Sequence, residues 1–349
     1  MEYFIKPDEM TPRERMDAFA KGEEVDRIPC CPIMGETCAP IFGIYPAQHN
    51  HSSELMTKVE VEVFKMFRPD GAGIGTGLRG VAEAMGTELV YPEKSISYVK
   101  KPVLKSYDDL GKIKPADPRK DGRLPIILRA LEMIDKEIGH EVEVSTDIAG
   151  PFSVAAAVRG TENLLKDLRK SPKELHYLLE IITESNLRFI DEACSMGFGV
   201  GFSDPVSSQS MISVPQFEEF VKPYMKKCMD RIAKWRGSGG GLHICGKSKG
   251  IWESMVDCGI SVLSIDNIED LEEAKNAVGD RVVIMGNIKP VDTVKLGSIE
   301  DIYKEARACI EKGGDSPKGF ILSTGCQIPI GTPPENIKAV MDAARIFGR

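Results

Sequence analysis

The sequence lacks any uninterrupted apolar stretch of about 18 residues, the length that a membrane-spanning helix needs. The first ten residues include Glu2, Lys6, Asp8 and Glu9, and therefore lack the apolar core of a signal peptide. No basic run occurs, and 45 Lys and Arg against 53 Asp and Glu give a net charge of −8, which disfavours binding to nucleic acid. These absences predict a cytoplasmic protein that contacts neither a membrane nor nucleic acid.

Two further absences concern domain organisation and cysteine chemistry. No Ser/Gly-rich or Pro-rich linker and no short-period repeat interrupts the 349 residues, so we expect a single domain over residues 1–349. The nine cysteines are odd in number and irregularly spaced, and a chain of this length does not need disulfides to hold its core. Reduced thiols are therefore expected.

Short apolar segments alternate with longer segments of helical pattern along the whole chain. Residues 282–285, for example, are all apolar, which is typical of a strand that is covered on both faces. Eight such segments are predicted to be strands: residues 29–34, 72–75, 142–146, 198–203, 241–245, 261–266, 282–287 and 320–324. Eight parallel strands are the number that closes a β/α barrel.

Capping residues mark the helix starts between these strands. Ser171-Pro172-Lys173-Glu174 combines a capping Ser, a Pro at the first helical position and a Glu that completes a capping box. The repeated order of strand, turn and capped helix predicts right-handed βαβ units and an α/β fold, the (β/α)8 TIM barrel. A doubly wound open sheet has the same alternation and is the alternative. Similar capping patterns occur at Thr11, Ser213 and Thr332.

Two regions fall outside this regular order. Residues 1–28 precede the first strand as an N-terminal elaboration, and residues 78–107 form an elaborated loop, or insertion, after the second strand. Within this loop, the composition of residues 90–91 and 96–99 predicts a hairpin or an extended insertion.

Polar and metal-binding residues fall at the ends of the predicted strands. In a parallel barrel the carboxyl ends of the strands and the loops after them carry the reactive groups, so these chain-distant residues are expected to converge on one rim. They are Asp147, Asp204, His243, Cys245, Asp266, Asn287 and Cys326.

His243-Ile244-Cys245 carries the metal-binding pattern. Side chains alternate along a strand, so residues two apart present an imidazole and a thiol to the same ion. Cys326 lies in the Gly- and Pro-bounded loop 323–329, where a packing cysteine has little reason to sit. One nitrogen and two sulfur ligands suit Zn²⁺, and three protein ligands leave the exchangeable position of a catalytic site. The alternative is that these cysteines are small buried hydrophobes.

The other seven cysteines are not assigned to the metal. Cys38 is left open between packing and function, because it lies in a loop near the rim. The six that are predicted to pack in the core are Cys30, Cys31, Cys194, Cys228, Cys258 and Cys309.

At these residues the sequence resembles the uroporphyrinogen decarboxylase superfamily, and within it the zinc-dependent methylcobamide:coenzyme M methyltransferases. The similarity covers nearly the whole chain, and the family fold is the eight-stranded barrel. The segments that carry the resemblance are residues 26–29, 150–153, 203–205, 216–224, 242–246, 285–288 and 325–336.

The segment after the first strand separates the branches of this family. The decarboxylases take a polyanionic tetrapyrrole and carry arginines there, whereas residues 30–38 of this chain contain none. The methyltransferase branch is similar to this chain at its zinc ligands, which correspond to His243, Cys245 and Cys326. A carboxylate from the sixth-strand region completes the coordination in that branch. Asp266 is the first candidate for it, and Glu269 is the second.

The resemblance implies transfer of a methyl group between a methylated corrinoid, or methylcobamide, and a small thiol such as coenzyme M. The metal removes the thiol proton, and the thiolate attacks the methyl group and leaves Co(I). Asp147, Asp204 and Asn287 would line the funnel, or alternatively cap loops and helices. The methionines that would face the corrin ring or fill the core are Met34, Met211 and Met285.

The corrinoid is expected on a separate small protein, because the chain contains no D-x-H-x-x-G cobalamin signature. Three alternatives stay open. They are a methyltransferase that demethylates a substrate onto the corrinoid protein, a uroporphyrinogen decarboxylase-type carboxy-lyase, and a non-catalytic member of the family. Zinc content and thiol-dependent consumption of methylcobalamin distinguish them.

Overall fold

The computed structural model describes residues 3–349. No helix of this range is both long and apolar enough to cross a membrane. The strands are β1 Ala72–Gly73, β2 Glu88–Val90, β3 Tyr98–Lys101, β4 Val144–Ala149, β5 Gly199–Ser203, β6 Gly241–Ile244, β7 Val262–Ile265, β8 Val283–Ile288 and β9 Phe320–Thr324. The helices are α1 Pro12–Lys21, α2 Pro46–His49, α3 Ser53–Phe67, α4 Gly80–Ala84, α5 Leu124–Ile138, α6 Pro151–Arg159, α7 Thr161–Lys170, α8 Pro172–Ser195, α9 Val214–Phe220, α10 Lys222–Arg236, α11 Trp252–Asp257, α12 Leu271–Val278, α13 Ile299–Gly313 and α14 Pro334–Phe347.

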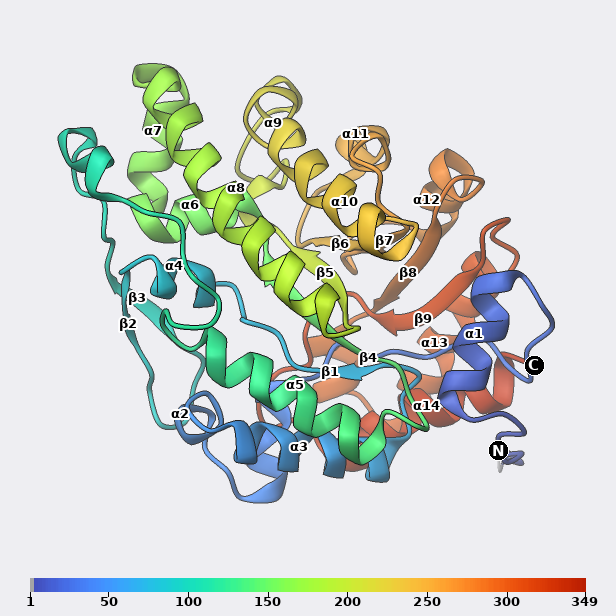
Figure 1. Cartoon of the computed structure of the whole chain (residues 1–349). Helices are drawn as coiled ribbons and strands as arrows, with labels where there is room; N and C mark the ends of the chain where they lie inside the picture. Colours follow the sequence, from blue (N-terminus) through green and yellow to red (C-terminus); the bar gives the residue numbers. More distant parts are fainter. Residues whose placement is uncertain (1–2) are drawn as a thin grey trace.

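Seven parallel strands form one curled sheet in the order β1-β4-β5-β6-β7-β8-β9, with the helices outside it (Figure 1). Each strand of this sheet therefore pairs with the one that follows it along the chain. A doubly wound sheet reverses its strand order at a switch point, and this sheet does not. The open-sheet alternative is wrong, and the parallel α/β arrangement is consistent with a TIM-type barrel.

The segment predicted as the first strand forms only a single bridge, between Cys30 and Leu322 of β9. Leu322 donates its N–H to the carbonyl of Pro29 (2.9 Å), and on the other side Asp70 donates its N–H to the carbonyl of Cys30 (3.0 Å). Pro29 and Pro32 have no N–H to donate, so the ladder does not extend beyond the two cysteines between them. A short segment thus lies between β9 and the chain before β1, where a full strand is predicted.

The other seven predicted strands are confirmed, with shifted ends. The clearest shift is in β4, which runs over Val144–Ala149 instead of residues 142–146. The N–H of Val142 is still bonded to the carbonyl of Ile138 at the end of α5, so the strand begins later. Asp147 consequently lies within β4 rather than after it.

The elaborated loop after the second predicted strand contains a hairpin, one of the two predicted alternatives. Its strands β2 and β3 are antiparallel, with Val90 opposite Tyr98 and Glu88 opposite Lys101. This pair forms its own two-stranded sheet beside the seven-stranded one.

Capping boxes begin two of the four helices for which the sequence predicts them. Before α1, Glu14 donates its N–H to Thr11 Oγ1 (3.2 Å) and its carboxylate accepts the N–H of Thr11 (2.8 Å); a second box precedes α9. The box predicted at Ser171 is not formed, because its N–H stays bonded to the carbonyl of Asp167 in α7. α14 has a proline at its N-cap position instead of a hydroxyl residue.

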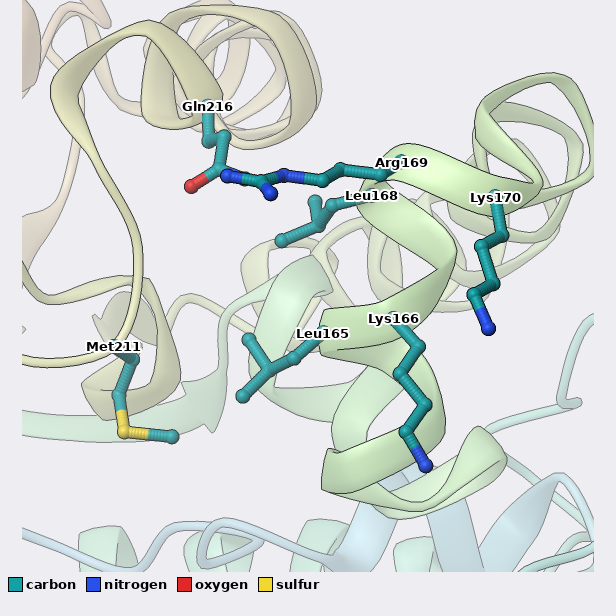
Figure 2. A pocket seen from close by; sticks show the side chains of 7 residues that line it. All are labelled: Leu165, Lys166, Leu168, Arg169, Lys170, Met211 and Gln216. Carbon is teal, nitrogen blue, oxygen red and sulfur yellow. The ribbon is translucent and has the colours of Figure 1, made fainter.

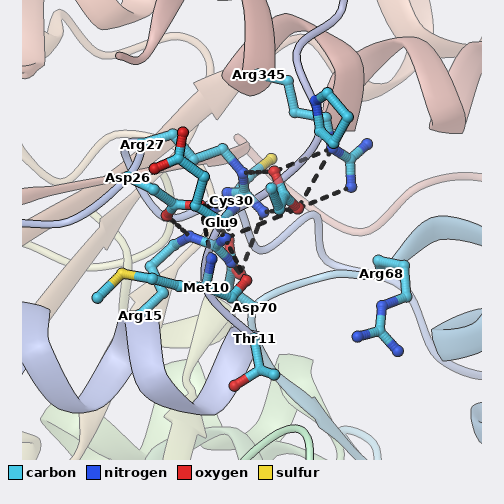
Figure 3. Close-up of polar contacts among 12 residues, drawn as sticks. Glu9, Met10, Thr11, Arg15, Asp26, Arg27, Cys30, Arg68, Asp70 and Arg345 are labelled. Atoms are coloured by element: carbon cyan, nitrogen blue, oxygen red, sulfur yellow. Dashed lines mark hydrogen bonds and ion pairs between the residues drawn. The ribbon is translucent and has the colours of Figure 1, made fainter.

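A buried ion cluster fixes the short first segment in place (Figure 3). The Asp70 carboxylate accepts hydrogen bonds from Arg15 (2.5 Å), from Arg27 (2.6 Å) and from the backbone N–H of Cys30 (2.6 Å). These side chains are almost fully buried. The carboxylate therefore both compensates two buried guanidinium groups and bonds the backbone next to β9.

The same cluster joins the two ends of the described chain. Asp8 accepts hydrogen bonds from Arg27 (2.8 Å) and from Arg345 in α14 (3.3 Å). Burial alone would raise the pKa of Asp8, but the hydrogen bonds and charges of the two guanidinium groups lower it to about 2. Asp26, paired with Arg15 (2.6 Å), has a lowered pKa for the same kind of reason. Both carboxylates are therefore ionised at neutral pH.

Candidate functional site

The curled sheet encloses a cavity of about 560 Å³. In barrels of this type branched side chains usually fill the interior, whereas here many interior positions are glycines. A Cβ at Gly73 would lie 1.8 Å from the carbonyl oxygen of Ser145, so the close approach of β1 to β4 requires glycine there. The interior glycines leave room for a ligand, and they are Gly71, Gly73, Gly75, Gly77, Gly201 and Gly241.

One group of metal-binding side chains lies on the wall of this cavity. His243 Nε2 is 2.9 Å from Cys245 Sγ, and Cys245 Sγ is 3.3 Å from Cys326 Sγ. All three ligand atoms lie within 4.8 Å of one another, and this is the one such group of three or more among residues 3–349. The structure therefore brings together the three residues that the sequence predicts to bind a metal.

The strands explain why these three residues meet. His243 is in β6 and Cys245 directly follows that strand, so their side chains share a face. Cys326 follows β9 by two residues, across the cavity mouth. The turn before it packs tightly on the loop after β7, because a Cβ at Gly325 would lie 2.4 Å from the backbone nitrogen of Asn267. Glycine at that position lets Cys326 reach the other two ligands.

The hydroxyl of Ser264 contacts the second ring nitrogen of His243, Nδ1, at 3.1 Å. Ser264 is opposite His243 in the register of β6 and β7, which is why the two side chains meet. This contact leaves Nε2 facing the two sulfurs. A hydrogen bond on the other ring nitrogen is the usual way in which proteins orient a metal-binding histidine.

The two thiols of the group affect each other's ionisation. The hydrogen bond from Cys245, together with His243, lowers the pKa of the Cys326 thiol. The same sulfur–sulfur contact, with burial, raises the pKa of Cys245. One thiolate is thus already favoured at neutral pH, and a divalent cation would favour the second.

The two carboxylates predicted to complete the coordination hold backbone groups instead. Asp266 accepts hydrogen bonds from the N–H of Gly246 (2.7 Å) and from the N–H of Ile268 (3.0 Å). Glu269 accepts from the N–H groups of Ser248 and Lys249. Neither carboxylate belongs to the group of three ligand side chains. Their contacts fix the loop that follows Cys245.

Asn287 supports the same loop from the neighbouring strand. Its side-chain amide donates to the carbonyl of Asp266 (3.0 Å) and to the carbonyl of Glu269 (2.7 Å). The side chain is 8% exposed and does not line the cavity. Of the two predicted roles for Asn287, these contacts match the capping of a loop.

The two predicted aspartates differ in position. Asp147 points into the cavity, where it accepts a hydrogen bond from Ser203 Oγ (3.0 Å); the surrounding protein raises its pKa to about 6. Asp204 has no exposed surface, lies outside the cavity lining, and accepts the N–H of Ser153 in the first turn of α6 (2.8 Å). Asp147 thus lines the cavity, whereas Asp204 caps a helix.

The three methionines that the sequence offers for a corrin ring are not on one surface. Met34 and Met285 line the cavity that holds His243. Met211 lines a separate, shallow cleft between α7 and the segment before α9, where Arg169 extends toward Gln216 (Figure 2).

Seven cysteines lie outside the metal-binding group, and the structure places six of them in the interior. Cys38, which the sequence leaves open, is 1% exposed and packs in the core. Cys31 departs from the prediction, because it is partly exposed and lines the cavity. The alternation of side chains along Pro29–Cys31 explains this, since Cys30 points into the core and its neighbour points the other way.

Three polar residues that the sequence reasoning did not single out also line the cavity: His49, Glu60 and Arg79. His49 is 1% exposed and neither ring nitrogen has a hydrogen-bond partner; burial and the charge of Arg123 lower its pKa to about 4. Burial raises the pKa of Glu60 to about 8. Arg79 follows β1 and thus the second predicted strand end, a position that the barrel rule itself indicates.

Comparison with known proteins covers almost the whole chain. The family model described as uroporphyrinogen decarboxylase (URO-D) matches residues 11–347. A methylcobamide:CoM methyltransferase of Methanosarcina barkeri is 29% identical over 343 residues, which are 96% of this chain and 98% of that protein. A chloroplastic uroporphyrinogen decarboxylase of Nicotiana tabacum is 26% identical over 310 residues, 86% of this chain and 77% of that protein.

A solved structure supports the same relationship. A methyltransferase from Methanosarcina mazei superposes with a TM-score of 0.86 at 28% sequence identity, and the match covers 96% of this chain and 98% of that one. The similarity in sequence and in fold therefore extends over nearly the full length of both chains.

Proposed function

Because the chain belongs to the uroporphyrinogen decarboxylase family, we propose that it is a zinc-dependent methyltransferase that moves a methyl group between a corrinoid and a small thiol. The observation that carries this proposal is the convergence of His243, Cys245 and Cys326 on the wall of a ligand-sized cavity. The names of the methyltransferase relatives point to the same chemistry.

The donor set fits zinc. One imidazole nitrogen and two thiol sulfurs are typical zinc ligands, and three protein ligands leave a fourth position for a substrate. The contact of His243 with Ser264 orients the imidazole, and the contact between Cys245 and Cys326 already favours one thiolate. When bound, zinc would lower the pKa of a substrate thiol and hold its sulfur in the cavity.

The residues of the chain then have distinct tasks. Asp266 and Asn287 keep the loop after Cys245 in position, through the backbone contacts described above. Asp147 is placed to take up the proton that the substrate thiol loses, because its carboxylate faces the same cavity. That Asp266 or Glu269 also enters the metal coordination stays a prediction.

The transfer itself forms one bond and breaks one. The thiolate sulfur attacks the methyl carbon, the new S–C bond forms, and the electron pair of the Co–C bond stays on cobalt as Co(I). Met34 and Met285 offer apolar surface on the cavity wall for the approach of the corrinoid. The corrinoid would be presented by a separate small protein, and the predicted cytoplasmic location agrees with such a partner.

Two other functions remain alternatives within the family. A decarboxylase acting on tetrapyrrole carboxylates is related to this chain at 26% identity, but the chain has no arginine in residues 30–38 to hold a polyanionic substrate. A methyltransferase that works toward the corrinoid uses the same site in the opposite direction.

The test combines metal analysis with an assay of the purified protein. We expect about one zinc per chain without added metal, and consumption of methylcobalamin only when a thiol is present. His243→Ala should lose both zinc and activity. A metal-free native protein that turns over uroporphyrinogen would reject the proposal in favour of the decarboxylase. Zinc without turnover of methylcobalamin by any thiol would favour a non-catalytic member.

A further inference from the structure

The wall of the cavity across from the metal-binding group carries its own polar residues. His49 ends α2, in the chain that follows Pro29–Cys31, and Arg79 directly precedes α4 and follows β1. In the order of the sheet, these positions lie three or more strands away from β6, which carries His243. A substrate that reaches both walls must therefore have a polar group at a distance from its thiol.

Arg79 is the cation of this wall that is free to bind a ligand. Its guanidinium makes no hydrogen bond and no ion pair with any side chain of residues 3–349, and burial lowers its pKa. The nearest carboxylate that acts on its charge is that of Glu36, and the side-chain amide of Asn50 hydrogen bonds that carboxylate. A half-buried guanidinium without a carboxylate partner is an unsatisfied anion-binding group.

The second arginine of the cavity differs in this respect. Arg123 donates to Glu83 (2.9 Å), to the hydroxyl of Tyr91 (2.6 Å) and to the side chain of Asn50 (2.8 Å). Its donors are thus used within the protein, and the ion pair with Glu83 compensates its charge. The cavity consequently offers one available cation rather than a set of them.

His49 supplies a further donor on the same wall. A neutral imidazole carries one N–H, and in His49 that group has no partner although the side chain is 1% exposed. Buried polar groups of proteins are rarely left without a hydrogen bond, so an unpaired one that faces a cavity marks a place for a ligand atom.

We propose that the thiol substrate carries a single acidic group, a sulfonate or a carboxylate, which binds the guanidinium of Arg79 and the ring N–H of His49. This inference rests on the proposed function for the thiol end of the substrate. One free cation matches one negative charge, and the planar guanidinium can donate two parallel hydrogen bonds to either kind of anion. A polyanionic ligand would leave most of its charges without a partner in this cavity.

The first experiment measures kinetics with three thiols of similar length, using methylcobalamin as the methyl donor. They are 2-mercaptoethanesulfonate, 3-mercaptopropionate and the uncharged 2-mercaptoethanol. We expect a lower KM for an acidic thiol than for the uncharged one, and the comparison between the two acids shows which anion is preferred. Arg79→Met should raise the KM of the acidic thiols by about ten- to a hundredfold and leave 2-mercaptoethanol unchanged. Arg79→Lys should retain part of the preference.

The second experiment tests the anion site without the methyl transfer. Binding of ethanesulfonate and propionate, which have no thiol, is measured by calorimetry on the protein as purified. Arg79→Met should weaken this binding, whereas Arg129→Met, at an exposed arginine outside the cavity, should not. His49→Phe should weaken it by a smaller factor, since only one donor is lost.

The results separate this inference from the proposed function. Equal KM values for charged and uncharged thiols, or the same anion binding in Arg79→Met and in the unaltered protein, would overturn the inference and leave the zinc methyltransferase standing. Arg79-dependent binding of ethanesulfonate by a protein without zinc or thiol methylation would keep the anion site and reject the function.

Discussion

Cys245 Sγ and Cys326 Sγ lie 3.3 Å apart although 81 residues separate them along the chain. Two unpaired thiols and an imidazole at such distances form a ready set of ligands, because little rearrangement is needed before a cation binds. The contact also identifies which of the nine cysteines matter for chemistry, and several predictions on residues around it can be measured directly.

Cys326→Ser should abolish stoichiometric zinc. Removal of one of three ligands leaves two protein donors, so we expect the zinc affinity to fall by more than about a hundredfold, the upper end of what supporting residues cause. Competition with a chromogenic chelator measures this. Cys31→Ser is the matched control, because Cys31 lines the same cavity but is not in the ligand group. Equal zinc affinity in the two variants would contradict the assigned ligand set.

Two substitutions at Asp266 distinguish a metal ligand from a residue that positions the loop. Asp266→Asn keeps an oxygen that can accept the N–H of Gly246, whereas Asp266→Ala removes both backbone contacts. If Asp266 only positions the loop, the Asn variant should lose less than about tenfold in zinc affinity and the Ala variant about ten- to a hundredfold. A loss as large in Asp266→Asn as in Cys326→Ser would show that the carboxylate binds the metal.

Asp70→Asn should be strongly destabilising. The substitution leaves Arg15 and Arg27 buried with less compensating charge, and breaking a buried pair in this way costs about 3–5 kcal/mol. The midpoint of urea unfolding, followed by circular dichroism, measures the change. Asp292→Asn, at an exposed aspartate, should change the free energy of unfolding by less than about 0.5 kcal/mol. Similar midpoints for the two variants would mean that the ion cluster does not stabilise the fold.

Glu60→Gln should remove part of the loss of stability at alkaline pH. Burial raises the pKa of Glu60 from 4.5 to about 8, so the folded state holds a proton that the unfolded state has lost between these values. Stability from this group is present below pH 4.5 and is lost as the pH rises through 8, with a slope of up to about 1.4 kcal/mol per pH unit.

The Gln variant cannot ionise, so its melting temperature should exceed that of the unaltered protein at pH 8 and approach it at pH 5. Thermal unfolding at a series of pH values measures the difference. A constant difference across that range would mean that Glu60 is ionised in the folded protein.

The ligand residues were accessible to prediction because their signal is local. His243 and Cys245 alternate on one strand, and the strand ends of a barrel meet at one rim, so sequence spacing and fold class together bring Cys326 to them. For Asp204, Asp266 and Asn287 the position on the rim was also correct. Their side chains nevertheless turn toward backbone N–H or carbonyl groups, and a short carboxylate or amide makes such contacts in a loop whether or not a ligand is near.

Other features depended on contacts that the sequence does not display. Two prolines reduce the first predicted strand to a single bridge, and this outcome follows from their missing N–H groups only once the pairing with β9 is known. Arg79 has no motif around it, and its importance comes from the absence of a partner, which only the arrangement of Glu36 and Asn50 reveals.

The ring of strands is closed at the bridge of Cys30 by a few hydrogen bonds and by the charges around Asp70, whereas every other joint in it is a ladder of paired strands. Local opening should therefore begin there, in the sense that the amides of Cys30, Cys31 and Asp70 exchange with deuterium before those of β5 or β8. Because Arg345 near the last residue and Asp8 near the first contact the same cluster, either end of the chain can act as a latch on this joint.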